Sequence, residues 1–396
     1  MSTAAGPVGT PLARSMPSDN DLQQYLRVAI AAPLRGLFDY LPPVVAFGQQ
    51  IFPGMRVLVP FGRGRRIGII TAVATTTESP AERLRSAEAV LDRTPLLTDQ
   101  DLRFVLWAAD YYHASPGEAL FTALPARLRR AQPGLETLVG EPHDGWRVKE
   151  ARVLDNGTRE QIHRRAPRQA EALALLDTHR EGLDDASIRG RIGNCSAVLR
   201  ALADKDLIER CRIDSAAGRV TPGQSAPPPE LNPDQRAAVQ SIRETRGFHC
   251  FLLDGVTGSG KTEVYLRLID DALRRGRQAL VLVPEIGLTP QLRDRFLQRI
   301  DVPMAVLHSA LGERERELAW NQAVRGQARL VLGTRSAVFT PLPALDLIIV
   351  DEEHDLSLKQ QDGFRYSARD LAVRRAQIAD CPVVLGSATP SLETLY

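Results

Sequence analysis

The amino-acid sequence predicts a multidomain α/β protein, with a small β-rich domain first, a mostly helical domain next and a parallel sheet last. Three observations support this fold class. With 396 residues, the chain is too long for one ordinary domain. Apolar runs in residues 27–97 are short and separated by Gly and Pro, as in a small sheet or barrel. Residues 232–396 instead alternate strand-like and helix-like segments, which is typical of a parallel sheet covered by helices.

The β-rich domain is predicted from four β-type runs. They lie at residues 27–31, 38–41, 56–60 and 66–73. Residues 1–26 are rich in Ala, Ser, Pro and Gly and lack the apolar core of a signal peptide, so we expect a disordered extension there. Residues 27–97 are therefore predicted to form one β-rich domain.

A winged helix domain is predicted for residues 98–214. An amphipathic helix is expected at 102–113, followed by a polar and poorly patterned stretch at 131–166. Three helix-like pieces and a run that looks like a β-hairpin arm follow, at residues 168–178, 185–191, 196–204 and 206–213. This order is typical of a winged helix-turn-helix, although a plain three-helix packing module fits it too.

The last domain is predicted to follow a Pro-rich linker, residues 215–231. Its strand-like apolar runs lie at residues 249–253, 279–283, 304–307, 329–332, 347–350 and 382–385. Helix-like segments separate these runs, so we expect a parallel sheet with helices on both faces.

A phosphate-binding loop is the most specific motif of the chain. Only four of the 50 basic residues are Lys, and Lys261 lies in a segment that matches the pattern G-x-x-x-x-G-K-[ST] between a strand-like run and a helix-like one. The predicted ATP-binding residues of this loop are Gly255, Thr257, Gly258, Ser259, Gly260, Lys261 and Thr262. In such a loop, backbone amides surround a phosphate while the Lys ammonium reaches the β- and γ-phosphates.

A second motif consists of acidic residues that directly follow the strand-like run 347–350. A carboxylate at the carboxyl end of a parallel strand faces the phosphate loop, so Asp351 and the Thr262 hydroxyl are the predicted Mg²⁺ ligands. Glu352 is placed to orient and deprotonate the attacking water. The predicted catalytic residues are Lys261, Asp351, Glu352 and His354.

The segment 386–390 follows another strand-like run and contains Ser387 and Thr389. Small hydroxyl residues here could simply cap a helix that begins near Ser391. Beside the two motifs above, we favour a role in coupling the nucleotide state to DNA contacts.

These three motifs together resemble superfamily two helicases of the DExH type, which implies a RecA-like first helicase lobe. Residues 232–235 resemble the glutamine motif that senses adenine, with Gln235 as the candidate. Residues 284–291 and 333–337 resemble the motifs that hold single-strand phosphates. The resemblance thus implies DNA contacts for Thr289, Arg335 and Ser336.

A narrower resemblance is to the primosomal protein N′ family of bacterial replication-restart helicases. Residues 359–370 resemble the aromatic-rich loop that couples DNA binding to ATP hydrolysis in that family. Phe364 and Tyr366 could stack on bases with Lys359 near the phosphates, although a surface loop with incidental aromatics fits the pattern too. The family usually has another aromatic where Leu358 stands, which puts the strength of this coupling in doubt.

The N-terminal part also resembles this family, in residues 34–41, 59–62 and 107–113. The family's first domain recognises the 3′ end of a nascent leading strand. The resemblance implies a pocket that includes Phe38, Asp39, Gly62 and Arg85, in which Asp39 could accept a hydrogen bond from a terminal 3′-OH.

Composition limits the alternatives. The net charge of +2 gives no global nucleic-acid signature, and no apolar run is long enough for a membrane span. The four Cys residues show no zinc-binding spacing and are expected as buried free thiols, so the zinc ligands usual in the family are absent from this chain. The expected cofactors are ATP and Mg²⁺, and we expect a cytoplasmic, nucleoid-associated bacterial protein.

The resemblance implies an ATP-driven 3′→5′ DNA helicase that recognises stalled or abandoned forks and starts primosome assembly. Its implied partners are DNA forks, single strands and nascent 3′ ends, with primosome proteins, single-strand binding protein and the replicative helicase loader. The family's second helicase lobe would follow Tyr396, so the alternative is a truncated DNA-binding module that binds ATP with little or no turnover.

Overall fold

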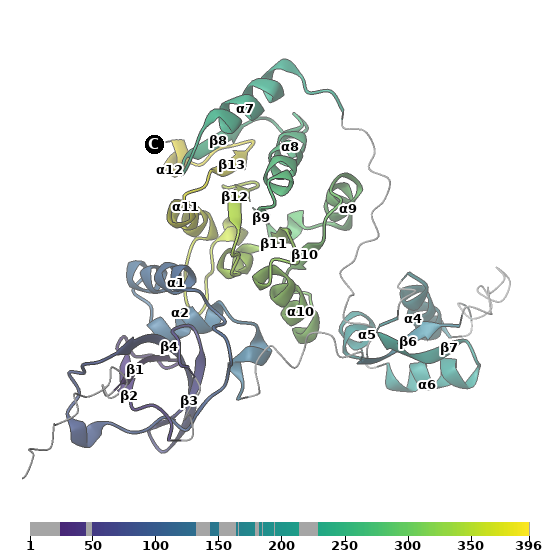
Figure 1. Ribbon diagram of the computed structural model, residues 1–396. Coiled ribbons are helices and arrows are strands. Elements are labelled where there is room, and N and C mark those ends of the chain that lie inside the picture. Colours follow the sequence, from purple (N-terminus) through teal and green to yellow (C-terminus); the bar gives the residue numbers. More distant parts are fainter. Residues whose placement is uncertain are drawn as a thin grey trace, which may run out of the picture.

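The computed structural model contains three bodies of secondary structure (Figure 1). It describes residues 24–44, 50–131, 143–149, 164, 166–178, 182–183, 185–193, 195–213 and 229–395. Most of the predicted extension and most of the predicted linker lie outside these residues. The predicted mixed α/β architecture is confirmed, with an antiparallel sheet near the N-terminus and a parallel one near the C-terminus.

The N-terminal body is a five-stranded antiparallel sheet with the strand order β2-β1-β4-β3-β5. Its strands are β1 (Tyr25–Ile30), β2 (Phe38–Tyr40), β3 (Arg56–Phe61), β4 (Gly64–Ala74) and β5 (Ala89–Val90). Apolar side chains of β1, β3 and β4 form a core of their own around Val28, Val57 and Ile70. The β-rich character predicted for this part of the chain is therefore confirmed.

Helix α2 (Pro116–Thr122) packs on this sheet, and α1 (Asp99–Tyr111) packs against α2. Thr98 begins α1 through a reciprocal capping box with Asp101. A Cβ on Gly117 would lie 1.8 Å from the Ile30 carbonyl oxygen, so α2 approaches β1 as closely as it does because residue 117 is Gly. Packing thus joins α2 to the sheet that precedes it, and the predicted domain boundary at residue 98 remains a prediction.

The next body consists of a two-stranded sheet, β6 (His143–Val148) and β7 (Ile208–Ile213), with α4 (Pro167–Thr178), α5 (Asp185–Ile192) and α6 (Ser196–Asp204). The three predicted helices are confirmed. The run at residues 206–213 does form a strand, β7, but the prediction that it is one arm of a β-hairpin is wrong. β7 pairs antiparallel with β6, which lies in the stretch predicted to be poorly patterned. Trp146 explains the pairing, because its ring is buried in the core of this body. A winged helix remains a prediction.

The C-terminal body contains a six-stranded parallel sheet in the order β10-β11-β9-β12-β13-β8. Its strands are β8 (Cys250–Asp254), β9 (Gln278–Leu282), β10 (Met304–Leu307), β11 (Leu330–Gly333), β12 (Leu345–Val350) and β13 (Val383–Ser387). All six predicted strands are present. β8 is an edge strand and is only partly buried.

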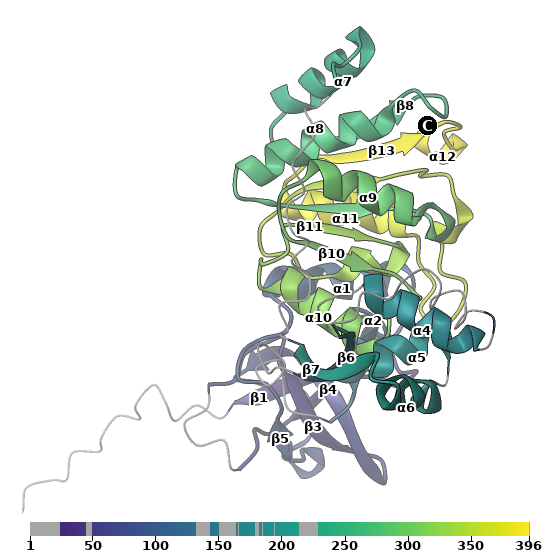
Figure 2. The same cartoon turned by 90° about the vertical axis from the view of Figure 1, so that its right-hand side faces the viewer.

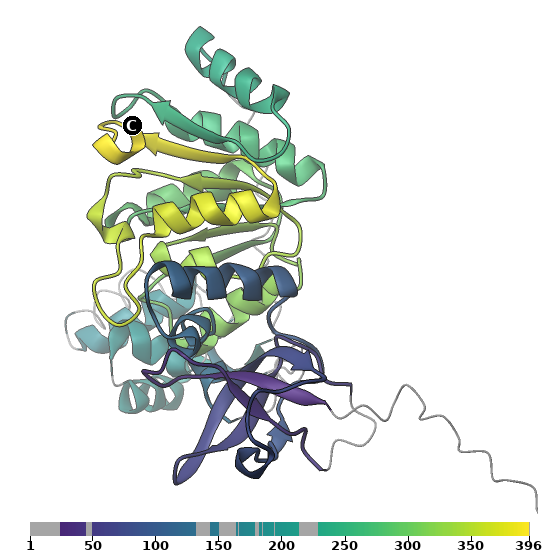
Figure 3. The same cartoon turned by 90° about the vertical axis from the view of Figure 1, so that its left-hand side faces the viewer.

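Helices cover both faces of the parallel sheet. One face carries α7 (Pro233–Glu244), α8 (Lys261–Arg274) and α9 (Pro290–Arg299), of which α8 and α9 cross the sheet in Figure 2. The other face carries α10 (Glu313–Val324) and α11 (Ala368–Ala379). Figure 3 shows α1 of the N-terminal body beside α11. The N-terminal body and the parallel sheet thus share one apolar core.

Candidate nucleotide site and its surroundings

The phosphate loop connects edge strand β8 to helix α8. Gly258 and Gly260 have φ angles of +85° and +86°, a conformation that side chains with a Cβ rarely adopt. Helix α8 begins at Lys261, so the backbone amides of its first turn face the loop. The predicted strand, Gly-rich turn and helix are all present, and this is the geometry that holds a phosphate.

Lys261 extends across the loop toward the segment that follows β12. Its Nζ atom donates to the Gly255 carbonyl oxygen at 2.5 Å and lies 3.8 Å from Glu352 Oε1. The Lys261 side chain is 10% exposed, so its charge is directed into the site rather than into solvent. The structure therefore brings together two predicted catalytic residues from segments far apart in the sequence.

Asp351 lies at the carboxyl end of β12, where it was predicted to bind Mg²⁺. Its Oδ1 atom accepts a hydrogen bond of 3.0 Å from the hydroxyl of Tyr265, a buried residue of α8. Burial raises the pKa of Asp351, and the neighbouring Glu352 carboxylate raises it further, while Tyr265 and Lys261 oppose the shift. A half-buried carboxylate and a hydroxyl are oxygen ligands of the kind that Mg²⁺ takes, so Asp351 and Thr262 fit Mg²⁺.

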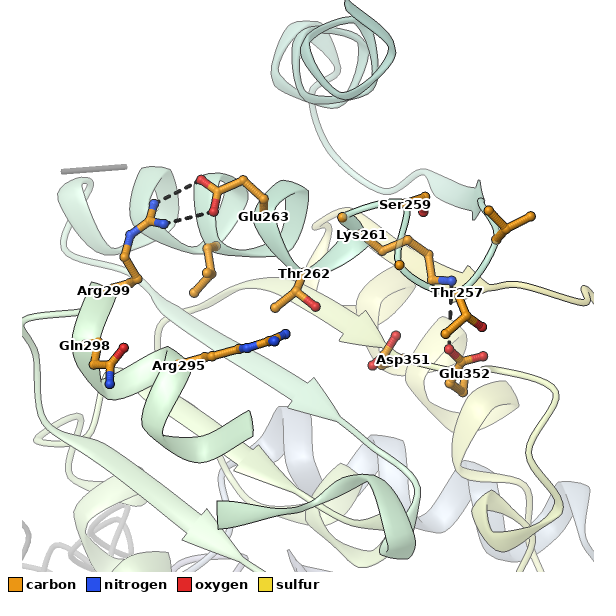
Figure 4. Close-up of a pocket in the computed structure, with 14 residues that line it drawn as sticks. Thr257, Ser259, Lys261, Thr262, Glu263, Arg295, Gln298, Arg299, Asp351 and Glu352 are labelled. Carbon is orange, nitrogen blue, oxygen red and sulfur yellow. Dashed lines mark hydrogen bonds and ion pairs between the residues drawn. The ribbon is translucent and has the colours of Figure 1, made fainter. Parts of the chain in front are cut away.

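An open cavity of about 600 Å³ surrounds this loop, as Figure 4 shows. Its lining includes the predicted residues Thr257 to Thr262, Asp351 and Glu352. It also includes Arg295, Gln298 and Arg299 of α9, which the motif search missed. The signal that could have found them is the polar face of the helix that follows β9, because that helix returns over the same edge of the sheet.

Gln235 lies beside the loop, on α7. Its Nε2 atom donates to the Ser259 carbonyl oxygen at 2.9 Å, and its Oε1 atom accepts from the backbone of Asn232 at 3.1 Å in a capping box. A Cβ on Gly260 would lie 2.4 Å from Gln235 Nε2. The predicted glutamine therefore contacts the loop directly, while its contact with adenine remains a proposal.

His354 connects the acidic segment to the strand next to it. Its Nδ1 atom lies 2.7 Å from the buried Ser387 Oγ, and its Nε2 atom lies 3.4 Å from Thr389 Oγ1. Ser387 Oγ also accepts a hydrogen bond of 3.1 Å from the Thr389 backbone amide. The two predicted coupling residues thus contact the predicted catalytic histidine, although they come from a different strand.

Glu353 is a further residue that motif reasoning did not single out. It is buried and accepts hydrogen bonds from the Ser391 backbone amide, Thr394 and Arg369, at 2.8, 2.7 and 3.2 Å. Burial alone would raise the pKa of Glu353, but these donors outweigh it and lower the pKa. Glu353 therefore fixes the segment after β13 to α11 and so supports the backbone around His354.

The aromatic loop differs from its prediction. Phe364 and Tyr366 are 5% and 4% exposed and pack against Phe339, with ring centroids 5.9 and 4.9 Å away. Tyr112, the residue that ends α1, lies 6.2 Å from the Phe364 ring and accepts from the Ser367 backbone amide at 3.2 Å. Burial raises the pKa of Tyr112 to about 12. The predicted base stacking is therefore wrong for this structure, because both rings lie in the core shared with the N-terminal body.

The residues predicted to hold single-strand phosphates lie at the same edge of the sheet as the nucleotide loop. Thr289 and Ser336 are exposed, and Thr289 also caps α9 by accepting from the Leu292 backbone amide at 3.2 Å. Lys359 is exposed as well. Arg335 Nη1 instead donates to the carbonyl oxygens of Ser357 and Lys359, both at 3.2 Å, so it braces the aromatic loop.

The predicted 3′-end residues come together on the N-terminal sheet. The Phe38 ring packs edge-on against Phe61, the residue before Gly62, at 5.2 Å. Asp39 accepts hydrogen bonds from Arg27 Nε at 3.2 Å and from Thr77 Oγ1 at 2.6 Å. Arg85 is exposed on the adjoining segment, whose backbone pairs with Leu41. The 3′-end role of these residues remains a proposal.

The described residues carry no sign of a structural metal or a membrane segment. They contain no group of three or more His, Cys, Asp or Glu that could hold a metal ion. In the same ranges, no helix combines the length and apolar character needed to cross a bilayer. Cys250 on edge strand β8 is exposed and Cys211 is half-buried, so the expectation of buried thiols is wrong for these two.

Two family models match the chain. The model for a 3′DNA-binding domain (3′BD) matches residues 27–125, and the model for a DEAD/DEAH box helicase matches residues 232–396. The first range includes α1 and α2, in agreement with the packing of α2 on the N-terminal sheet. The second begins at the start of α7 and includes the whole parallel sheet.

Curated relatives match most of the chain. Replication restart protein PriA of Haemophilus influenzae is 42% identical over an alignment of 387 positions, which covers 93% of this chain and 50% of that protein. Its counterpart in Bacillus subtilis is 34% identical over an alignment of 419 positions, gaps included, which covers 90% of this chain and 52% of that protein. The chain spans about half the length of these relatives. Among solved structures, the DEAD-box helicase Mss116 bound to ssRNA and UDP-BeF covers 42% of this chain and 37% of its own, with 19% identity and a TM-score of 0.33.

Proposed function

We propose that this chain, which is homologous to replication restart protein PriA over most of its length, acts as an ATP-dependent 3′→5′ DNA helicase of replication restart. It carries a 3′DNA-binding domain and a DEAD/DEAH box helicase domain. We further propose that it recognises stalled or abandoned forks and starts primosome assembly. One observation carries the proposal. Lys261, Asp351 and Glu352, from two different strand ends, line one cavity.

The protein's own residues support ATP hydrolysis at this site. The backbone amides of the loop and of the first turn of α8 bind the phosphates. Lys261 moves away from Glu352 and contacts the β- and γ-phosphates. Asp351 and Thr262 would hold Mg²⁺, which would neutralise part of the phosphate charge there. Glu352, freed from Lys261, orients a water and accepts its proton on the carboxylate.

Coupling to DNA is proposed to run through His354, Ser387 and Thr389. These side chains form a continuous contact from the catalytic segment after β12 to the segment after β13. A displacement at either end changes the hydrogen bonds at the other, so the nucleotide state and the strand-binding edge bias each other. Thr289, Arg335, Ser336 and Lys359 are the proposed phosphate contacts at that edge.

The N-terminal sheet is proposed to bind a nascent 3′ end. Phe38, Asp39, Gly62 and Arg85 form the proposed pocket. The Asp39 carboxylate accepts a hydrogen bond from a terminal 3′-OH, whereas a continuing phosphate there is repelled. Other proposed partners are single strands, primosome proteins, single-strand binding protein and the replicative helicase loader, in the bacterial cytoplasm at the nucleoid.

A second candidate function is a DNA-binding module that binds ATP with little turnover. The observation that favours it is that every residue lining the cavity belongs to one sheet and its own helices. Related motors complete the site with arginines that stabilise the transition state, and such residues change rates by about 10³–10⁵.

A DNA-stimulated ATPase assay on this chain separates the two candidates, with Lys261→Ala as the control. DNA-stimulated turnover that Lys261→Ala abolishes supports the helicase function. Nucleotide binding that Lys261→Ala abolishes, without turnover, supports the second candidate. If the chain binds no nucleotide, both candidates fail.

A further inference from the structure

Helix α9 presents two arginines to the nucleotide cavity, and they are held very differently. Arg295 and Arg299 are four residues apart and so lie on one face of the helix. Arg299 forms a bidentate ion pair with Glu263 of α8, with N–O distances of 2.9 and 3.0 Å. Arg295 is exposed, and its guanidinium makes no hydrogen bond or ion pair with any residue that the structure describes. Figure 4 shows it pointing into the space between Thr262 and Asp351.

The backbone beneath Arg295 is fixed although its side chain is free. The next residue, Phe296, is 1% exposed and packs into the core beneath α8. The ion pair between Arg299 and Glu263 joins α9 to α8, and Thr289 caps the start of α9. Arg295 therefore projects from a rigid backbone, so ligand binding has to order its side chain but not the helix that carries it.

The charges of the cavity indicate what that ligand is. Its lining carries three basic residues, Lys261, Arg295 and Arg299, and three acidic ones, Glu263, Asp351 and Glu352. Glu263 engages Arg299 and also Arg267 of α8, whose Nε atom lies 3.0 Å from it, and Lys261 is shared between the loop and Glu352. Of the basic residues that line the cavity, Arg295 is then the one that forms no ion pair with a carboxylate of the described residues. A guanidinium in this state matches the oxygens of a phosphate.

The position of Arg295 indicates which phosphate group of a bound nucleotide its guanidinium would contact. Gln235 contacts the loop at Ser259, whereas Arg295 approaches from the side of Thr262 and Asp351, where Mg²⁺ fits. The terminal phosphate of a triphosphate lies on the Mg²⁺ side. We propose that Arg295 contacts the γ-phosphate of ATP and so makes the site discriminate ATP from ADP within this lobe. This inference rests on the proposed nucleotide binding.

The test compares the affinity of the full chain for a non-hydrolysable β,γ-imido ATP analogue and for ADP, each with Mg²⁺. We expect Arg295→Ala to weaken binding of the analogue about tenfold and binding of ADP less than about threefold. Arg295→Lys keeps the positive charge but loses the planar guanidinium, so we expect its affinity for the analogue to lie between those of the original chain and of Arg295→Ala. Arg293→Ala is the matched control, because Arg293 is exposed on the same helix, lies outside the cavity lining and pairs with Asp294 at 3.3 Å.

Two results overturn this inference while the proposed function stands. One is an Arg295→Ala variant that binds both nucleotides as the original chain does. The other is an equal loss for ADP and the analogue, which would show that Arg295 does not sense the γ-phosphate. If the original chain binds neither nucleotide, or if Lys261→Ala leaves binding intact, the proposed function itself fails.

Discussion

At the scale of single residues, the nucleotide site depends on one contact between a helix and the strands beneath it. Tyr265 is 2% exposed and donates to Asp351, while its hydroxyl lies against Gly386 of β13. Burial raises the pKa of Tyr265 and the nearby Asp351 carboxylate raises it further, so the hydroxyl keeps its proton and donates. Gly386 thus supports the site although it does not line the cavity.

We expect Gly386→Ala to destabilise the lobe and to weaken nucleotide binding. The added Cβ would lie 1.6 Å from the Tyr265 hydroxyl, so Tyr265 must move and its hydrogen bond to Asp351 is lost. Overpacking of this kind costs about 1–3 kcal/mol. Thermal unfolding measures the loss, and Gly36→Ala is the control because no other atom lies within 4 Å of its added Cβ. An unchanged melting temperature for Gly386→Ala would contradict this packing.

At the scale of elements, the carboxyl ends of the parallel strands place all the motifs at one edge. The phosphate loop follows β8, the acidic segment follows β12, and the segment with Thr389 follows β13. β13 lies between β8 and β12, so Ser387 is adjacent to both of the other motifs. This strand order explains why His354 and Ser387 meet although they are 33 residues apart.

The aromatic loop belongs to the interface between α1 and α11. We expect Phe364→Ala to lower the stability of the protein by about 3 kcal/mol, because truncating a buried aromatic leaves a cavity. Urea unfolding measures the effect. Leu356→Ala in the same segment is the control, since Leu356 is 71% exposed. A Phe364→Ala variant of normal stability with weakened single-strand binding would instead restore the base-stacking prediction.

At the scale of the whole molecule, the N-terminal body and the parallel sheet are held together by charge as well as by their shared core. Arg127, in the turn after α2, lies 3.2 Å from the buried Glu317 of α10. The geometry is that of an ion pair without an aligned hydrogen bond to Glu317 Oε2. Burial raises the pKa of Glu317, and Arg127 is the largest influence that opposes this shift.

We expect Arg127→Ala to destabilise the protein more at pH 7.5 than at pH 5. The folded pKa of Glu317 lies above its ordinary value, so the folded state holds the proton longer and stability falls as pH rises through that raised pKa. Removing Arg127 strengthens this effect and costs about 1–2 kcal/mol at the higher pH, allowing for partial exposure. Melting temperatures at the two pH values measure it.

The control for this prediction is Arg130→Ala. Arg130 also joins the N-terminal body to α10, through Glu313 at 3.0 Å, but both side chains are more than half exposed. Its removal is expected to cost less than about 1 kcal/mol at either pH. Equal effects of Arg127→Ala at the two pH values would show that Glu317 is not the group responsible.

Features that depend only on residues close together in the chain could be predicted before the fold was known. Gly258, Gly260 and Lys261 form the loop because backbone freedom and a helix start are local properties. The parallel strands were likewise predictable, because each buried strand is an unbroken apolar run. The convergence of Asp351 with Lys261 followed from the rule that carboxyl ends of parallel strands share an edge.

The tertiary structure decided what depends on neighbours distant in sequence. The stretch with Trp146 was misjudged because its strand partner lies about 60 residues away, and no local pattern specifies that pairing. Phe364 is exposed or buried according to whether α1 covers it, which the sequence of the loop does not encode. Arg295 faces the nucleotide cavity because α9 packs beside α8, so its environment is set by helix packing and not by a motif.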